Sequence, residues 1–429
     1  MKALGVALIS LGLVLPAIAA EPARKSLAEC VAVALAQQPT LKATGATVAA
    51  ARERVWQNAA SYLPQVNASY SANRRKATTG SLLGSNAGGR ARTFNFYSTG
   101  VGFTQVLFDF GQNLSLIHAA QAEAAAAAAD ADTENDSVVF GVRQSYFALL
   151  AAYRLRDVAD ETVRQNRQHA DLAQGRFDVG LAPRFDVTQA QVQIASAELG
   201  QLTAHNDVAL ARETLRNAMG LSGPLDFDII DELAPPKGAI DDDEVLDLAY
   251  DHRPELRSIR AQEEAAKQRI SALEKDYLPK VTGNGAYTWS GSTYPLRDTW
   301  NLGAAVTLSV FNGGLTTAQV GEAKALLANL QWNEAALHQN ITLEVRQATL
   351  NVRQAAESIR VADKGAGQAQ ENLEIAEGRY AAGVSSIIEL TDAQTSLTSA
   401  RANQVQALVN YRTALATLER ATAHPLTAD

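Results

Sequence analysis

The sequence predicts mixed α and transmembrane β structure: four membrane strands per chain, joined to very long coiled-coil helices, in two internal repeats. Three observations lead to this class. Two halves of the chain repeat one another, two stretches of 66 residues contain no proline, and four segments alternate apolar with polar residues. The formal charge of −8 argues against nucleic acid as a partner, because a phosphate backbone attracts basic patches.

The N-terminus predicts a signal peptide over residues 1–20. Lys2 precedes the apolar run Ala3–Leu15, and small residues follow at Ala19 and Ala20. With about 13 apolar residues, the run is too short to span roughly 30 Å of hydrocarbon. The single cysteine, Cys30, excludes an internal disulfide and is expected to be a small buried residue. We therefore expect an exported chain.

One phrase occurs twice in the chain. Gly175–Gln191 has the sequence GRFDVGLAPRFDVTQAQ, and Gly378–Gln394, 203 residues later, has GRYAAGVSSIIELTDAQ. Nearer the N-terminus, SYLPQV (61–66) matches DYLPKV (276–281) at an offset of 215. A longer loop in the first half, RRKATTGSLLGSNAGGR, accounts for the difference, since loops tolerate insertions. Such self-similarity predicts two structural repeats.

We assign residues 21–225 to the first repeat, 226–240 to a linker or equatorial segment, and 241–429 to the second repeat. Each repeat should contain a helix pair, two strands and a long helical hairpin. In the first repeat, the strands are expected at about 62–74 and 94–109 and the hairpin at 112–220. In the second, the strands are expected at about 278–290 and 299–311 and the hairpin at 315–422.

The strands are predicted from alternation. In residues 300–311 apolar side chains take every second position, and segments 65–71 and 280–290 alternate likewise. Segment 94–108 is less regular. Strands of roughly 9–11 residues with one apolar and one polar face are typical of a barrel around a wet lumen. A half-buried hairpin on a soluble core would alternate similarly; export and the long helices favour the barrel.

Long helices are predicted from Gln112 to Phe177 and from Leu315 to Tyr380. In the second stretch apolar residues recur at steps of three and four, which indicates a coiled-coil-like seam. At 1.5 Å per residue, each helix reaches roughly 100 Å. A compact domain does not need this length, whereas a gap between two membranes does.

The strands predict an oligomer. Four strands do not close a barrel, for which about eight are the practical minimum, and lipid does not tolerate an open strand edge. Three copies would supply twelve strands around a wet lumen, and two copies would supply a narrow eight-stranded barrel. The many Asn, Gln, Ser and Thr residues on one strand face favour the trimer.

Several motifs, in this order and partly duplicated, carry a family resemblance. They are the LA…Q-x-P-x-L opening, the YLP corners, FDFG and FNGG, and the two GR[FY]-x-x-G phrases with DVTQAQ and ELTDAQ. The chain resembles the TolC-like outer-membrane channels of tripartite efflux pumps and type I secretion. The resemblance implies a homotrimer with a 12-stranded barrel in the outer membrane, continuous with a periplasmic tunnel of 12 helices. It also implies two partners, a periplasmic adaptor and an inner-membrane transporter.

The repeated phrases are expected to form helix–turn–helix joints, which the resemblance places at the periplasmic tip of the tunnel. Gly180 and Gly383 should supply the permissive backbone of each turn. The residues expected in tip turns, adaptor docking and gating are Gly175, Arg176, Phe177, Gly180, Gly378, Arg379, Tyr380 and Gly383.

Acidic residues follow each turn. Glu389 and Asp392 are three apart and share one helix face, and the resemblance implies that these positions line an entrance constriction that favours cations. Asp186 and Gln189 hold the matching positions in the first half. The alternative is a solvated helix face on which an acid near the N-terminus stabilises the helix dipole.

Tyr380 matches a tyrosine that latches the closed state in relatives. Its usual basic partner position is occupied here by Ser385, so Arg176 or Arg379 is the expected substitute. The six histidines show no metal-ligand spacing, and no enzyme or cofactor motif is present. The expected function is a passive export duct, for drugs, metal ions or secreted proteins. The alternative is a periplasmic coiled-coil scaffold or adhesin without a pore.

Overall fold

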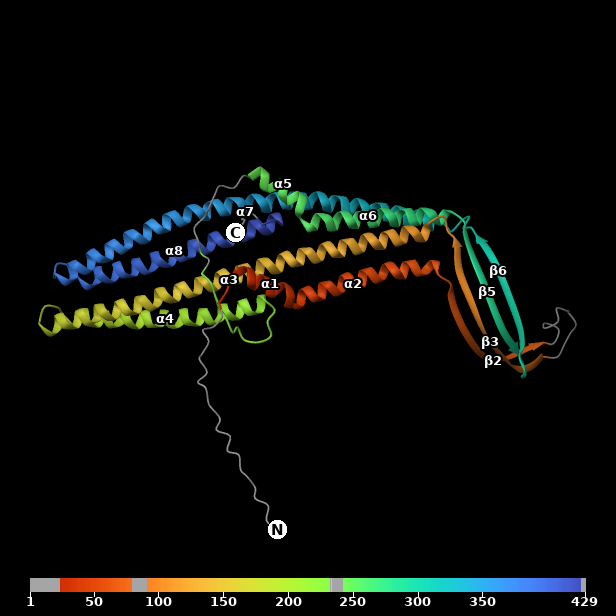
Figure 1. Cartoon of the computed structure of the whole chain (residues 1–429), viewed down its shortest axis with the longest axis horizontal. Helices are drawn as coiled ribbons and strands as arrows, with labels where there is room; N and C mark the ends of the chain where they lie inside the picture. The colour runs from red at the N-terminus through yellow and green to blue at the C-terminus, as the bar shows by residue number, and fades with distance from the viewer. Residues whose placement is uncertain (1–23, 79–90, 232, 234–241, 426–429) are drawn as a thin grey trace, which may run out of the picture. The chain divides into compact units, whose positions relative to one another are not determined.

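The computed structural model describes residues 24–78, 91–231, 233 and 242–425, and Figure 1 traces their helices and strands. The signal peptide expected at 1–20 lies outside these residues, as does part of the expected linker. In the described ranges, no helix combines the length and the apolar character that crossing a membrane requires.

Each half of the chain begins with two shorter helices that meet at a proline. In the first half these are α1 (Leu27–Gln37) and α2 (Pro39–Ala59), and in the second α5 (Asp242–His252) and α6 (Pro254–Glu274). Proline suits the first position of a helix, because its fixed φ is helical and its missing N–H would have no partner there. The expected interruptions at the two prolines are therefore present.

Two helices of 67 residues follow the strands, α3 (Gln112–Asp178) and α7 (Leu315–Ala381). Each returns through a second helix, α4 (Arg184–Ala218) or α8 (Ile387–Thr422). The starts of α3 and α7 differ by 203 residues, as do those of α4 and α8. The helix bounds thus reproduce the offset of the sequence repeat.

One antiparallel sheet contains the strands β2 (Gln65–Thr78), β3 (Ala91–Phe108), β5 (Lys280–Gly291) and β6 (Arg297–Thr307). Their order is β2-β3-β5-β6, so the central β3–β5 pair joins the two repeats. A two-residue strand, β1 (Arg24–Lys25), pairs in parallel with β4 (Asp228–Ile229) elsewhere in the chain.

The register places the apolar residues of the four strands in common rows. One row contains Val66, Phe103, Gly285 and Leu302, and the next contains Ala68, Val101, Tyr287 and Trp300. The row between them contains Asn67, Gly102, Ala286 and Asn301. Because paired residues share a face and neighbours alternate, the predicted apolar and polar faces are confirmed. Leu302 is 71% exposed and Trp300 73% exposed, so the apolar face is bare in the single chain.

A glycine shapes this face. A Cβ built at Gly285 would lie 2.5 Å from the Phe103 ring and 3.2 Å from Leu302, so the absent side chain makes room for both neighbours. A larger residue at Gly285 would push the Phe103 ring away from the sheet.

Two strand ends differ from the sequence prediction. Residues 75–78, which follow the expected strand at about 62–74, extend β2, because Arg75 pairs with Phe94 and Lys76 with Thr93 across the hairpin. Strand β6 ends at Thr307 instead of 311, because Thr307 pairs with Lys280, the first residue of its only neighbour in the described sheet. Pairing with another strand, which the sequence pattern does not report, sets both ends.

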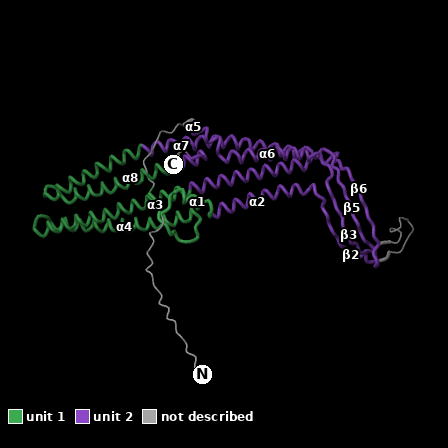
Figure 2. Tube along the Cα trace, viewed as in Figure 1, with its two compact units in different colours: residues 1–37, 141–236, 357–413 green, residues 38–140, 237–356, 414–429 purple. Residues whose placement is uncertain are grey.

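The chain divides into two compact units, shown in Figure 2. Unit 1 contains residues 1–37, 141–236 and 357–413, and unit 2 contains residues 38–140, 237–356 and 414–429. Each unit combines parts of both repeats, because α3 and α7 each contribute to both. The sequence repeats are therefore not the compact units, and their bounds at 21–225 and 241–429 stay a prediction.

Candidate functional site: the helix joints of the repeated phrases

Both repeated phrases end a long helix in the same way. Gly180 has φ +77° and Gly383 has φ +78°, a region that residues with a side chain rarely adopt. In the first joint the N–H of Leu181 donates to the carbonyl oxygen of Arg176 at 2.8 Å, and that of Gly180 to Phe177 at 2.9 Å. This pair of bonds is a Schellman motif. The predicted role of the two glycines is confirmed.

The second joint repeats this geometry. The N–H of Gly383 donates to the carbonyl of Tyr380 at 3.0 Å, and that of Val384 to Arg379 at 3.0 Å. Gly175 and Gly378, also expected in the turns, lie instead in the last turns of α3 and α7. They are helical residues that precede the turn.

Acidic residues begin the returning helices as expected. Asp186 lies in the first turn of α4 and Glu389 in the first turn of α8, where a carboxylate stabilises the helix dipole. At α8 the hydroxyl of Ser386 accepts the backbone N–H of Glu389 at 3.4 Å.

Arg176 joins the first hairpin to the second. Its Nη1 donates to the carbonyl oxygens of Tyr380 and, at 2.9 Å, Ala381, which end α7. Its guanidinium also lies 5.0 Å from the centre of the Tyr380 ring. A cation at this position satisfies terminal carbonyls and stabilises the helix dipole. Of the two arginines offered as partners of Tyr380, the structure places Arg176 against it.

Tyr380 also connects the two hairpins, through a hydrogen bond to Asp186. Its hydroxyl donates to Oδ2 of Asp186 at 3.1 Å, and its side chain is 1% exposed within an apolar cluster of Leu373, Ala376, Ile387, Leu390, Ala393 and Leu397. Burial, and then the neighbouring Asp186 carboxylate, raise the pKa of Tyr380 to about 12. The phenol is therefore neutral and able to donate at physiological pH.

The four residues expected at an acidic entrance have different surroundings. Glu389 forms an ion pair with Arg379 at 3.1 Å, and both side chains are about half exposed. Asp392 is exposed on the same helix, and Gln189 is half-buried on α4. Asp186 accepts the Tyr380 hydroxyl instead of being free. One chain cannot form a ring, so the acidic constriction stays a prediction.

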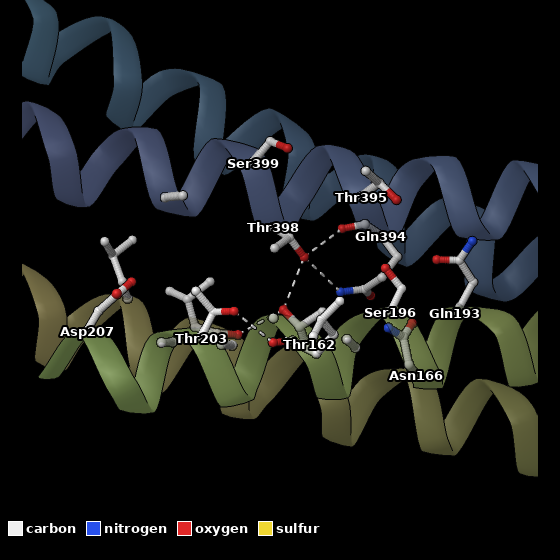
Figure 3. A pocket seen from close by; sticks show the side chains of 18 residues that line it. Thr162, Asn166, Gln193, Ser196, Thr203, Asp207, Gln394, Thr395, Thr398 and Ser399 are labelled. Carbon is white, nitrogen blue, oxygen red and sulfur yellow. Dashed lines mark hydrogen bonds between the residues drawn. The ribbon is translucent and has the colours of Figure 1, made fainter. Parts of the chain in front are cut away.

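A cavity of about 610 Å³ lies between α3, α4 and α8. Figure 3 shows the side chains that line it. Polar side chains cross from α3 to α8 beside it. The hydroxyls of Thr162 and Thr398 are 3.1 Å apart, and Nε2 of Gln394 donates to Oε1 of Gln165 at 2.7 Å. We call these four residues the internal seam. No sequence pattern predicted this seam, although Gln394 is the last residue of the repeated phrase.

The site has no metal-binding arrangement. In the described part of the chain, no three His, Cys, Asp or Glu side chains lie close enough together to hold a metal ion. The joints instead supply turns, helix caps and hydrogen bonds between the two hairpins.

Comparison with known proteins supports a transport role. The family model described as outer membrane efflux protein matches residues 31–221 and 245–424. The outer membrane protein TolC of Vibrio cholerae is 26% identical over 418 residues, which cover 92% of this chain and 91% of that protein. These proteins are outer-membrane channels, not enzymes.

Solved structures give the same fold. CusC is 20% identical, with a TM-score of 0.80 and coverage of 94% of this chain and 92% of that one. VceC of Vibrio cholerae is also 20% identical, with a TM-score of 0.79 and coverage of 94% and 97%. The family model, its two matched segments and the shared fold agree along nearly the whole chain. The chain therefore belongs to the outer membrane efflux protein family, whose members reside in the outer membrane.

Proposed function

We propose that the chain is the outer-membrane exit duct of a tripartite efflux pump or type I secretion system and works as a homotrimer. One observation carries this proposal: a four-stranded sheet with one bare apolar face in a chain of an outer-membrane family. Such a face is stable against lipid, while the opposite, polar face suits a water-filled lumen.

The sheet edges support closure by further copies. In the described sheet, β2 and β6 each pair with one strand, which leaves a row of backbone groups on either edge. Lipid cannot satisfy these groups, so another strand must. Three copies would close a barrel of twelve strands, wide enough for a wet lumen.

The repeat also predicts how the edges meet. Within the chain, β3 pairs with β5 across the repeat boundary, and Phe103 lies opposite Gly285. At the repeat offset of 203, Phe103 on β3 corresponds to Val306 on β6. At the offset of 215, Gly285 on β5 corresponds to Tyr70 on β2. The side chains of Val306 and Tyr70 belong to the apolar face and are exposed, at 70% and 64%. Val306 should therefore lie opposite Tyr70 of the partner subunit.

The helical hairpins would extend through the periplasm to an adaptor and an inner-membrane transporter, which supplies the energy. At the joints, Arg176, Tyr380 and Asp186 hold the two hairpins of one chain together, and this contact is proposed as the closed latch. Glu389 and Asp392 would face the entrance, where carboxylates from three chains attract cations.

Conductance and native mass test the function together. Purified protein in a planar bilayer should be trimeric by native mass spectrometry and give a cation-selective conductance that Mg²⁺ blocks from the tip side. Oxidising a Val306→Cys/Tyr70→Cys variant should link subunits covalently. A folded oligomer without conductance, even after Tyr380→Phe weakens the latch, would support the scaffold alternative and refute the duct.

A further inference from the structure

The apolar face of β2 becomes basic towards the end of the strand. From the start of β2, every second position carries an uncharged side chain: Val66, Ala68, Tyr70 and Ala72. The next two positions of the same face are occupied by Arg74 and Lys76, whose side chains are exposed. Because side chains two residues apart point to the same side of a strand, both cations share a face with the apolar residues.

The basic positions lie at the end of β2 that is far from the helices. The strand begins at Gln65, shortly after α2, and ends at Thr78, where the chain turns towards β3 (Figure 1). Arg74 lies eight residues beyond Val66, and Lys76 lies ten residues beyond it. At about 3.3 Å per residue and a tilt of roughly 40°, they lie about 20 and 25 Å from Val66 along the membrane normal. The apolar band of a membrane barrel is about 25 Å tall, so the two cations lie at its far boundary.

Aromatic side chains precede the basic positions on this face. Tyr70 is 64% exposed, and its row of the sheet also contains Trp289, which is 40% exposed. In the next row, Ala72 pairs with Tyr97. Tyrosine and tryptophan are enriched where a membrane meets water. The two cations therefore follow the interfacial level of the sheet, at the depth of lipid headgroups.

The residues around the two cations leave their charge uncompensated. Their cross-strand partners are Asn95 and Thr93, which are uncharged. The segment 79–90, which joins β2 to β3, contains no Asp or Glu in its sequence. On β6, Asp298 accepts a hydrogen bond from the hydroxyl of Tyr287 at 2.8 Å. The end of β2 is therefore positive on its apolar face, although the whole chain has a formal charge of −8.

We propose that Arg74 and Lys76, here called the basic pair, bind a phosphate group of a phosphorylated glycolipid in the outer leaflet of the outer membrane. Their Cα atoms are about 7 Å apart on one face, so both long side chains reach one phosphate. The arginine guanidinium donates paired hydrogen bonds to phosphate oxygens, and the lysine ammonium adds a compact charge.

The apolar face selects a lipid as the source of the phosphate. Below the basic pair, Tyr70 and Val66 are exposed, at 64% and 66%, and would lie against the acyl chains of the same molecule. Free phosphate would use the two charges but leave these apolar side chains uncovered. The inference rests on the proposed duct, because it requires the helices in the periplasm and the far end of the sheet in the outer leaflet.

Lipid binding to the purified protein tests this assignment. Native mass spectrometry measures the affinity for lipid A with two phosphates and for the same lipid without phosphates. Arg74→Gln/Lys76→Gln should lower the affinity for the phosphorylated lipid at least tenfold and leave the affinity for the unphosphorylated lipid unchanged. Both side chains are exposed, so the melting temperature without lipid should stay the same.

The matched control removes two positive charges from the opposite face of the same end of the sheet. Arg75 lies between the two cations in the sequence, and Arg297 belongs to a polar row with Ser71, Ser98 and Ser290. Arg75→Gln/Arg297→Gln changes the net charge by the same amount as the test variant. It should change the affinity for the phosphorylated lipid less than twofold.

Three results would overturn the basic pair as a lipid site: equal loss of affinity in both variants, equal affinity of the unmodified protein for the two lipids, or displacement of the lipid by an equal concentration of inorganic phosphate. Planar-bilayer conductance separates this failure from that of the proposed function. Normal conductance without a preference for the phosphorylated lipid removes only the basic pair. A folded protein with neither conductance nor an oligomer removes the duct and, with it, the placement of the basic pair in the outer leaflet.

Discussion

Removing the Tyr380 hydroxyl should open the joint without disturbing its packing. Tyr380→Phe deletes the hydrogen bond to Asp186, measured at 3.1 Å, and keeps the ring inside its apolar cluster and under Arg176. A hydrogen bond to a charged group contributes about 1.5–3 kcal/mol. Because about 1.4 kcal/mol changes an equilibrium constant tenfold, the equilibrium constant for opening each latch should rise about 10- to 100-fold.

Single-channel recording at neutral pH measures this change as open probability and mean conductance. Tyr411→Phe is the control, because Tyr411 is also buried on the second hairpin but donates no hydrogen bond to a carboxylate in the described structure. Equal open probability for Tyr380→Phe, Tyr411→Phe and the unmodified protein would refute the latch.

The same contact has a pH signature. Because the pKa of Tyr380 is raised to about 12, the folded state favours the neutral phenol. Its contribution is fully present below the ordinary tyrosine pKa of about 10 and is lost as the pH rises through the raised value. Between pH 7 and pH 10 the latch should therefore show no dependence on Tyr380 ionisation, and an opening step in that range that Tyr380→Phe abolishes would contradict this assignment.

Three further sets of substitutions test other groups. Arg176→Lys keeps the charge but loses the planar guanidinium whose Nη1 donates to two carbonyls, so open probability should rise about tenfold; an unchanged value would show that charge alone suffices. Glu389→Ala with Asp392→Ala should weaken Mg²⁺ block, and unchanged block would remove both acids from the entrance. Burial, and then the Glu334 carboxylate, raise the pKa of Glu263. The folded state therefore favours the neutral Glu263 side chain, whose contribution to stability declines as the pH rises through the raised pKa. Glu263→Gln should flatten the pH dependence of the melting temperature, and an unaltered slope would contradict this role of Glu263.

Patterns of neighbouring residues predicted the helices, the turns and the strand faces. The repeat offset of 203 residues located the matching helices α3 and α7, because similar sequences begin and end a helix at equivalent residues. Gly180 and Gly383 predicted the two turns, because glycine adopts a positive φ without strain. Alternation along the strands defined their faces, because side chains of an extended chain point to opposite sides in turn.

The repeat, the long helices, the strand faces and the glycine turns follow from residue patterns along the chain. Packing between helices sets the contacts of Arg176 with the end of α7, of Tyr380 with Asp186, and of Gln394 with Gln165. Pairing between strands sets where β2 and β6 end. These contacts join residues far apart in the chain, and their existence depends on which helix faces meet. Periodicity reports the face of one element, while its partner and register come from packing between elements.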